Sequence, residues 1–368
     1  MIEINPAINK HIFESKRREI YWRLKEIGLE EQECQAEARL IIEHISGIKQ
    51  AEQLIKDIDQ FPEKWQQEIT RIINMRAERR PLAYCLGEIE FAGLIYRVVP
   101  GVLIPRTDTE TLIEVVVEWV EKARDEAEAA LNLKERTERS KCAGEAYAAE
   151  QLRIRAYALA HKLRQCSLEA EAALNLNIAE IGIGSGIIAI SLLKRLPNCK
   201  VWACDISQAA ITTAWGNARR HGVHERLTLV HGDWRKVLPN DFDVIVSNPP
   251  YVSSGLNCSS ALESNKGQKE NAAQRRKQLE PEIFYEPKEA LFAGEDGLDF
   301  YRDFARVLPR HYKKAKEGEA EISLLGAFEI GDKQEQSVLA IFKNNGWQNL
   351  QSKKDINGLP RVILGNPI

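Results

Sequence analysis

Four consecutive residues, Asn248, Pro249, Pro250 and Tyr251, have the chemistry of a site that holds a planar amino group. The two prolines end a strand and remove two backbone donors, so the exposed carbonyls remain free to accept hydrogen bonds. The Asn248 side-chain oxygen and the Pro249 carbonyl could both accept from one NH2 group, and the Tyr251 ring could lie against its plane. This set suits a substrate amide or aromatic amine. The alternative is a proline-stiffened loop with a packing tyrosine.

A glycine-rich turn precedes this tetrapeptide in the chain and directly follows a short apolar run. Glycines let a backbone turn tightly and approach a ligand closely. The spacing is G-x-G-x-G without a Gly-Lys-Ser/Thr sequence, which excludes a phosphate-cradling P-loop and leaves a ligand-binding turn or a plain strand-to-helix turn. The candidate cofactor contacts in this turn are Glu180, Gly182, Ile183, Gly184, Ser185 and Gly186.

Acidic residues end the next two apolar runs. Asp205 stands 19 residues after Gly186, where an acid in a doubly wound fold accepts hydrogen bonds from ribose hydroxyls. Asp233 could accept from an adenine amino group, and Trp234 could stack on the ring. The alternatives are helix capping by Asp205 and simple packing of Trp234. Together these features indicate an adenosine-type ligand, and they do not separate NAD from S-adenosylmethionine.

All these candidates follow predicted strands. From residue 178 the chain alternates short apolar runs with helical segments, the runs being NIAEIGIG, KVWACD, RLTLVHGD and FDVIVSNPPY. Such alternation predicts an α/β fold with a parallel, doubly wound sheet and right-handed crossovers. Because ligands bind at the carboxyl ends of strands in open α/β sheets, we expect the candidates to meet at one edge of the sheet.

The N-terminal part of the chain has a different pattern. Residues 1–85 carry apolar residues at helical spacing, including Leu24, Leu40 and Ile41, and Pro62 opens a further helix, so we expect a small helical domain. Residues 86–115 contain short β-type runs with glycine and proline punctuation, which predicts a β-hairpin that bridges two domains. The remaining residues, 116–368, would form the α/β domain.

Two stretches look like insertions in that domain. The octapeptide EAEAALNL occurs at 126–133 and again at 169–176, which indicates a duplication that inserted about 43 residues into one connection. The stretch 126–176 is rich in Ala, Glu, Arg and Lys and favours a solvated helical excursion without a catalytic role. A second polar stretch, 253–278, directly follows the tetrapeptide and has the composition of an extended loop.

Composition excludes several classes of function. The formal net charge is −3, and residues 1–90 hold 14 Lys+Arg against 17 Asp+Glu, which argues against direct nucleic-acid binding. Seven scattered cysteines without a C-x-x-C pair, and histidines without an H-E-x-x-H motif, predict reduced thiols and no metal site. The chain has no spanning apolar run and no apolar signal segment, so we expect a cytoplasmic protein that does not enter a membrane.

The tetrapeptide looks like that of amino-directed S-adenosylmethionine methyltransferases, and the flanking residues narrow the resemblance. The chain resembles the HemK-like family, whose members are protein-(glutamine N5) methyltransferases acting on peptide chain release factors. The resemblance covers nearly the whole chain outside the two insertions. The segments that carry it are RRPLAYCLGEIEF (79–91), VVPGVLIPRTDTE (98–110), NIAEIGIGSG, CDIS, HGDW, VSNPPY, YEPKEALFAGEDGLDFYR (285–302), FEIGDKQ (328–334) and DINGLPRV (355–362).

The resemblance implies a class I methyltransferase sheet, a helical substrate-recognition domain and S-adenosylmethionine as the cofactor. It implies transfer of a methyl group to the glutamine of the Gly-Gly-Gln loop of class I release factors in translation termination, by a monomer. Asn248, Pro249 and Tyr251 would be catalytic, and the whole tetrapeptide, Pro250 included, would bind the substrate. The cofactor contacts would be those of the glycine-rich turn together with Asp205, Asp233, Trp234 and Asn248.

Other functions remain as alternatives to this interpretation. An adenine-N6 methyltransferase acting on DNA or RNA can use a similar tetrapeptide on a flipped base, although it needs a basic face. A non-catalytic binding module could keep the fold, but the intact tetrapeptide and turn argue against it. An NAD dehydrogenase is disfavoured because Asn-Pro-Pro-Tyr offers no proton donor suited to a carbinol.

Overall fold

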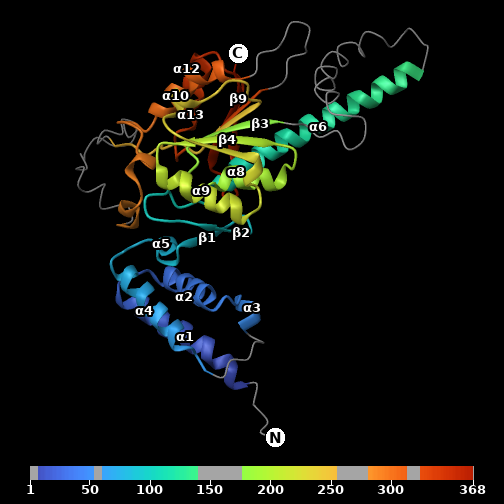
Figure 1. The fold of residues 1–368 in the computed structure, drawn as a ribbon. Helices are drawn as coiled ribbons and strands as arrows, with labels where there is room; N and C mark the ends of the chain where they lie inside the picture. Colours follow the sequence, from blue (N-terminus) through green and yellow to red (C-terminus); the bar gives the residue numbers. More distant parts are fainter. Residues whose placement is uncertain (1–6, 54–59, 140–175, 255–280, 313–323, 368) are drawn as a thin grey trace. The chain divides into compact units, whose positions relative to one another are not determined.

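A computed structural model describes residues 7–53, 60–139, 176–254, 281–312 and 324–367 (Figure 1). The chain divides into two compact units. The smaller unit comprises residues 1–89, 98–100 and 273–286, and the larger unit comprises residues 90–97, 101–272 and 287–368.

The smaller unit is helical, as the sequence predicts. Ile20, Leu24 and Ile41 are fully buried in its core, whereas Leu40, which the helical spacing places among the apolar residues, is 39% exposed. The first helical stretch breaks at Gly28, which has a left-handed φ of +87° that favours glycine. The helices are α1 (Ala7–Glu26), α2 (Glu31–Ser46), α3 (Gln50–Gln53), α4 (Glu63–Ala77) and α5 (Leu82–Leu86).

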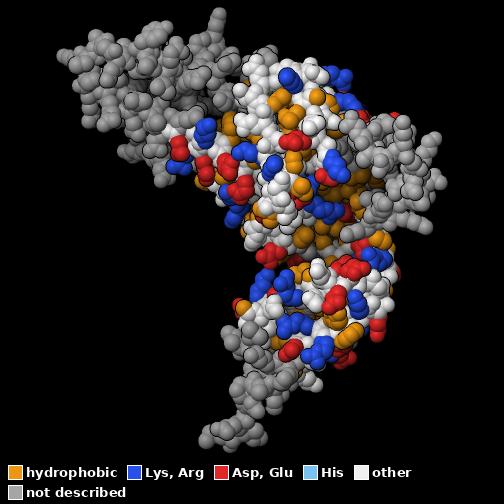
Figure 2. All heavy atoms as spheres, turned by 180° about the vertical axis from the view of Figure 1, so that it is seen from behind, with side chains coloured by type: hydrophobic (Ala, Val, Ile, Leu, Met, Phe, Trp, Pro, Cys, Tyr) orange, Lys and Arg blue, Asp and Glu red, His pale blue; other side chains and the backbone are white. Residues whose placement is uncertain are grey.

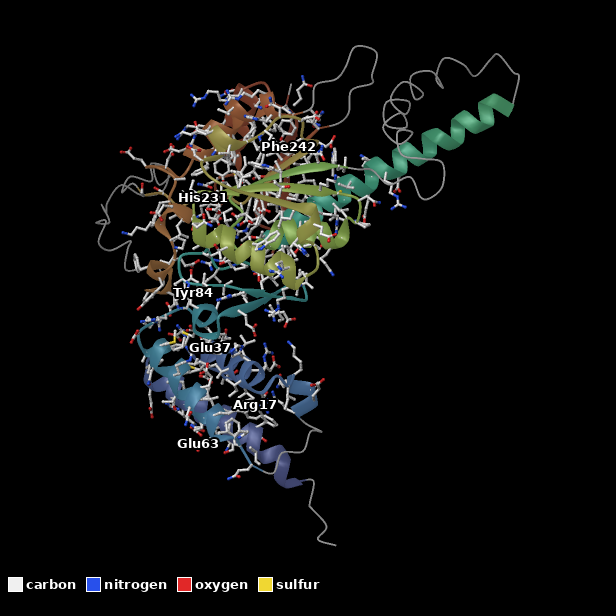
Figure 3. The ribbon with its side chains drawn as sticks, in the orientation of Figure 1. Arg17, Glu37, Glu63, Tyr84, His231 and Phe242 are labelled. Carbon is white, nitrogen blue, oxygen red and sulfur yellow. The ribbon has the colours of Figure 1, made fainter. Side chains whose placement is uncertain are left out.

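A buried charge cluster ties this unit together. The guanidinium of Arg76 on α4 is 1% exposed and lies 2.8 Å from carboxylates of both Glu33 and Glu37 on α2. Arg76 also pairs at 3.2 Å with Glu282, in the 3₁₀ turn Pro281–Tyr285. Figure 3 labels Glu37 among these helices. A buried guanidinium requires such partners, because an unpaired charge in an apolar interior is very costly.

The larger unit is built on a seven-stranded sheet of order β5-β4-β3-β6-β7-β9-β8. The first five strands in this order are parallel, and β9 is antiparallel to both of its neighbours. This arrangement is typical of class I methyltransferases, so the expected doubly wound, Rossmann-like sheet is confirmed. The strands are β3 (Asn177–Ile181), β4 (Lys200–Asp205), β5 (Leu227–His231), β6 (Val244–Ser247), β7 (Leu325–Glu329), β8 (Gln348–Lys354) and β9 (Pro360–Asn366).

Helices cover both faces of this sheet, and Figure 1 shows α8 and α9 on the face opposite α10, α12 and α13. The long helix α6 (Thr109–Arg139) packs on α8 and on the β7 and β9 strands. A separate two-stranded sheet is formed by β1 (Glu88–Phe91) and β2 (Leu94–Arg97). The remaining helices are α8 (Ile187–Arg195), α9 (Gln208–Arg220), α10 (Trp234–Val237), α12 (Asp299–Val307) and α13 (Glu335–Asn344).

Strand register brings the carboxyl ends of the parallel strands to one edge. Ile181 pairs with Cys204, Asp205 pairs with His231, and Ser247 pairs with Phe328. Figure 3 shows His231, at the end of β5, and Phe242, just before β6, at opposite ends of the sheet. The residues that follow the strands therefore gather at the edge marked by His231.

The two predicted insertions lie mostly outside the described residues. The first EAEAALNL copy, 126–133, continues the backbone of α6, as its helix propensity predicts. Residues 140–175 and 255–280, which hold most of the second copy and of the polar stretch, are not among those described.

Candidate active site

A cavity of about 630 Å³ opens at the carboxyl edge of the sheet, entirely within the larger unit. Its wall combines the glycine-rich turn, the end of β4, the start of α10 and the tetrapeptide. The predicted site residues on its wall are Gly182, Gly184, Asp205, Asp233, Trp234, Asn248, Pro249 and Pro250. The lining residues do not include the other predicted residues, Glu180, Ile183, Ser185, Gly186 and Tyr251.

The glycine-rich turn is held against the end of β4 by its own backbone. Gly182 N and Ile183 N both donate to the Cys204 carbonyl, at 2.9 and 3.0 Å. Gly182 and Gly184 have φ values of +79° and +54°, and an added Cβ at either would meet no atom within 4 Å. Because both glycines line the cavity, the space beside them is open for a ligand to approach the backbone. At Gly186, in contrast, an added Cβ would stand 3.2 and 3.3 Å from the Cβ and Cα of Ala214 on α9.

Asp205 joins the turn to the cavity. Its Oδ2 accepts from Gly184 N at 3.0 Å, and its Oδ1 accepts from Ser207 N at 2.8 Å. Burial raises the pKa of this carboxyl, and the backbone donors act in the opposite sense. Each carboxylate oxygen can accept more than one hydrogen bond, so Asp205 keeps acceptor capacity toward a ligand. The N-cap of α9 is Ser207 rather than Asp205, and the Ser207 hydroxyl accepts a hydrogen bond from Ala210 N at 3.3 Å.

Glu180, on β3, caps the beginning of helix α8. Its Oε2 accepts from Ala189 N, in the first turn of α8, at 2.9 Å. The N-cap residue of that helix is Gly186, which has no side chain to cap with. The carboxyl is 1% exposed, and burial raises its pKa well above the ordinary value. The sequence marked Glu180 as a cofactor contact; its observed contact is to the helix.

Asp233 and Trp234 form the start of α10. Asp233 caps this helix by accepting from Arg235 N at 3.0 Å and faces the Arg235 guanidinium. Trp234 lines the cavity but is 4% exposed, and its ring packs edge-on against Phe304 with centroids 5.2 Å apart. Its indole Nε1 is buried without a hydrogen-bond partner. Trp234 therefore packs in the core, as the alternative interpretation of the sequence expects, and it also lines the cavity.

The tetrapeptide follows β6 and is held by hydrogen bonds to Thr109 and Gln334. Asn248 Nδ2 donates to Thr109 Oγ1 at 3.1 Å. The Asn248 and Thr109 side chains also neighbour the buried Glu329 carboxyl and lower its pKa, while its Oε2 has no hydrogen-bond partner. The Tyr251 carbonyl accepts from Gln334 Nε2 at 3.0 Å. Burial raises the pKa of Tyr251 to about 12, so its phenol stays protonated near neutral pH.

Two domain families match the sequence. Residues 17–87 match the PrmC N-terminal domain, and residues 148–264 match the methyltransferase small domain. A release factor glutamine methyltransferase of Geobacter sulfurreducens is 32% identical over 296 residues, which are 80% of this chain and 76% of that protein. The chain belongs to the release factor glutamine methyltransferase family.

Further relatives extend the match. The release factor glutamine methyltransferase of Moorella thermoacetica is also 32% identical, over 79% of this chain and 77% of that protein. A bifunctional methyltransferase of Rickettsia felis is 34% identical over 94% of this chain but only 56% of that protein. The chain therefore spans about half the length of several curated relatives that it matches.

This family member has site residues that the sequence reasoning did not single out. Thr109, Glu329 and Gln334 contact the tetrapeptide from behind. All three lie in segments that carried the family resemblance, VVPGVLIPRTDTE and FEIGDKQ, but no role could be assigned to them without the strand register. The same holds for Leu103 and Phe300 on the cavity wall.

Metal-ion chemistry and cysteine chemistry both lack a suitable group among the described residues. The described residues contain no cluster of three His, Cys, Asp or Glu side chains that could hold a metal ion. Cys204 lines the cavity as a free thiol, and burial raises its pKa to about 12, which keeps it a poor nucleophile.

Among the described residues, no helix is long and apolar enough to cross a membrane.

Proposed function

We propose that this chain transfers a methyl group from S-adenosylmethionine to the side-chain nitrogen N5 of the glutamine in the Gly-Gly-Gln loop of peptide chain release factors. One observation carries the proposal. A single cavity is lined both by the adenosine-type features, Gly182, Gly184 and Asp205, and by Asn248, Pro249 and Pro250 of the amide-binding tetrapeptide. A donor of a methyl group and an acceptor amide can therefore meet in one enclosure.

The residues of the cavity fit the proposed cofactor. The open space over Gly182 and Gly184 would admit a chain of atoms close to the backbone, and Asp205 would accept from the ribose hydroxyls. Asp233 and Trp234 would border the adenine. When bound, S-adenosylmethionine supplies a methyl group on a positively charged sulfur.

The tetrapeptide would make the substrate nitrogen reactive by electrostatics and position. An amide nitrogen is a poor nucleophile because its lone pair is delocalised into the carbonyl. Asn248 Oδ1 and the Pro249 carbonyl would accept the two N–H hydrogens and stabilise the positive charge that develops as the nitrogen–carbon bond forms and the carbon–sulfur bond breaks. Holding the nitrogen in line supplies much of the remaining rate enhancement. One hydrogen then leaves the nitrogen as a proton to water.

The helical unit would recruit the release factor. Its match to the PrmC N-terminal domain supports this role. The competing substrate class, DNA or RNA, would need a continuous basic face. Figure 2 shows Lys and Arg side chains interspersed with Asp and Glu over the face that it presents.

The test is mass spectrometry of a release factor incubated with this protein and S-adenosylmethionine. We expect a gain of one methyl group on the glutamine of the Gly-Gly-Gln loop, and none when that glutamine is replaced by alanine. A parallel reaction with duplex DNA and with RNA would show where labelled methyl groups go. Label in adenine, with none in the release factor, would overturn the proposal in favour of the adenine-N6 activity.

A further inference from the structure

The end of β7 and the turn after it contact both ends of the tetrapeptide, although they lie some eighty residues further along the chain. Glu329 is the last residue of β7, and Gln334 immediately precedes α13. Because Phe328 pairs with Ser247, the next residues along these parallel strands, Glu329 and Asn248, lie beside each other. The register thus places a carboxylate next to the side-chain amide on which the proposed chemistry depends.

Glu329 fixes which way the Asn248 amide points. The Glu329 side chain is 1% exposed, and its Oε2 is buried without a hydrogen-bond partner. The Asn248 amide and the Thr109 hydroxyl are its hydrogen-bonding neighbours, and both act to lower its pKa. A carboxylate can only accept hydrogen bonds, so the Asn248 atom facing it must be the nitrogen. That nitrogen also donates to Thr109 Oγ1. The Asn248 oxygen is then directed away from this cluster and is free to accept from a ligand in the cavity that Asn248 lines.

Gln334 fixes the other end of the tetrapeptide. Its Nε2 donates to the carbonyls of Tyr251 at 3.0 Å and of Gly297 at 3.3 Å, and its Oε1 accepts from Gly331 N at 2.9 Å. The fit around Tyr251 is close. A Cβ on Gly297 would stand 2.3 Å from the Tyr251 carbonyl oxygen, and one on Gly331 would stand 2.9 Å from the Tyr251 ring.

We infer that Glu329 and Gln334 are positioning residues that hold the two acceptors of the tetrapeptide toward the substrate amide. The inference rests on the proposed function. Glu329 acts through Asn248, whose oxygen it orients and, by its negative charge, makes a stronger acceptor. Gln334 acts through the Tyr251 backbone, which fixes the loop that carries Pro249 and Pro250.

The state of the Glu329 carboxyl gives this role a pH signature. Charged and titratable groups face it from three parts of the chain: Asp108 just before α6, Arg361 on β9 and Tyr251 of the tetrapeptide. Burial is the largest influence and raises the pKa of Glu329 to about 7. When protonated, Glu329 carries an O–H donor that competes with the Asn248 N–H groups, so the amide orientation is no longer dictated. Methyl transfer should therefore fall as pH falls through about 7.

The first test compares E329Q with the control E335Q, which changes a carboxyl on the first turn of α13. We expect kcat of E329Q to fall on the order of tenfold to hundredfold, as when an orienting partner of a reactive group is lost. Its pH profile should lose the rise through pH 7 that the wild type and E335Q show. An E329Q profile that keeps this rise, or an unchanged kcat, would overturn the role of Glu329.

The second test compares Q334E and Q334A with the control Q336A, at an exposed position of α13. Q334E keeps the shape but loses both donors to Tyr251 and Gly297. We expect kcat to fall on the order of tenfold or more, while the Kd for S-adenosylmethionine, measured by calorimetry, stays within about twofold. Loss of cofactor binding together with activity would overturn a positioning role, because the residue would then support the whole cavity.

The wild-type reaction separates this inference from the proposed function. If the wild-type protein leaves the release factor unmethylated, the proposed function fails. If the wild type and both controls methylate it and the Glu329 and Gln334 variants do so equally well across pH, only the positioning inference fails.

Discussion

At the scale of single residues, the proposed chemistry depends most on Asn248. Asn248→Ala removes one of the two acceptors for the substrate NH2 group and should lower kcat on the order of 10²–10³, as expected when one preorganised polar group is lost from a transition state. Steady-state methylation of a release factor measures it. Asn240→Ala, at an exposed position before β6, is the matched control. A wild-type rate for the Asn248 variant would reject the assignment of this residue.

Asp205 carries the second prediction at this scale. Asp205→Ala removes the acceptor proposed for the ribose and also the partners of Gly184 N and Ser207 N. We expect the Kd for S-adenosylmethionine to rise on the order of tenfold or more, because a carboxylate that accepts hydrogen bonds is worth about 1.5–3 kcal/mol. Asp205→Asn keeps one acceptor oxygen and should lose less affinity than the alanine variant.

Calorimetric titration of both variants tests that order. Asp332→Ala, at an exposed carboxylate after β7, serves as the control. Equal affinity in the wild type and in Asp205→Ala would contradict the prediction.

The residues that could be predicted from the sequence are those whose role is visible in local spacing. Gly182 and Asn248 directly follow recognisable strands and Asp205 ends one, and the structure brings all three to one cavity. Thr109 and Glu329 could not be predicted, because their contact with Asn248 depends on which strands are neighbours and on their register. The sequence also contains no sign that Glu180 accepts a hydrogen bond from Ala189 N in the first turn of α8, because this contact depends on how the turn folds back on the strand.

At the scale of elements, β3 and β7 each bury a carboxyl near the carboxyl end of the strand. Burial raises the pKa of Glu329 from 4.5 to about 7 and raises that of Glu180 well above 4.5. An unfolded chain restores the ordinary values, so the folded state binds more protons in this interval. For Glu329, the stability contributed by this difference is fully present below about pH 4.5 and is lost as pH rises through about 7.

E329Q tests this linkage. The variant does not titrate at this position, so its free energy of unfolding relative to the wild type should increase between pH 5.5 and pH 8, by about 2 kcal/mol. Urea denaturation at the two pH values measures the change, with E335Q as the control. A difference between E329Q and the wild type that stays constant with pH would contradict the prediction.

Element prediction succeeded where burial is strong and failed where it is weak. The runs that became β3, β4 and β6 are apolar because interior parallel strands covered by helices are largely buried. β5 lies at one edge of the sheet and is only partly buried, but it keeps Leu227, Leu229 and Val230 and could still be predicted. β8, with the sequence QNLQSKK, has no such pattern because it lies at the edge of the sheet, where polar and lysine side chains are favoured. The break between α1 and α2 at Gly28 could not be predicted from the apolar residues, because their helical spacing continues almost unchanged across it.

At the scale of the whole molecule, the duplicated octapeptide indicates that the connection between α6 and β3 has been lengthened by about 43 residues. Leu112, Val116 and Val120 of α6 are buried, and all three precede the first copy. The second copy ends at Leu176, directly before the first residue of β3. Because the two copies are identical, deletion of residues 134–176 leaves EAEAALNL directly before Asn177, as in the full chain.

We therefore expect the deletion of residues 134–176 to keep cooperative unfolding and methyl transfer close to those of the full chain. Shortening the connection favours the folded state by on the order of 1–2 kcal/mol of loop-closure entropy, and the earlier end that it requires in α6 offsets part of this gain. Thermal unfolding and release-factor methylation measure the two properties. A control deletion of equal length, residues 117–159, removes the buried Val117 and Val120 and should unfold the larger unit. If both deletions abolish cooperative unfolding, the inserted residues belong to the fold itself, and the duplication has become part of its core.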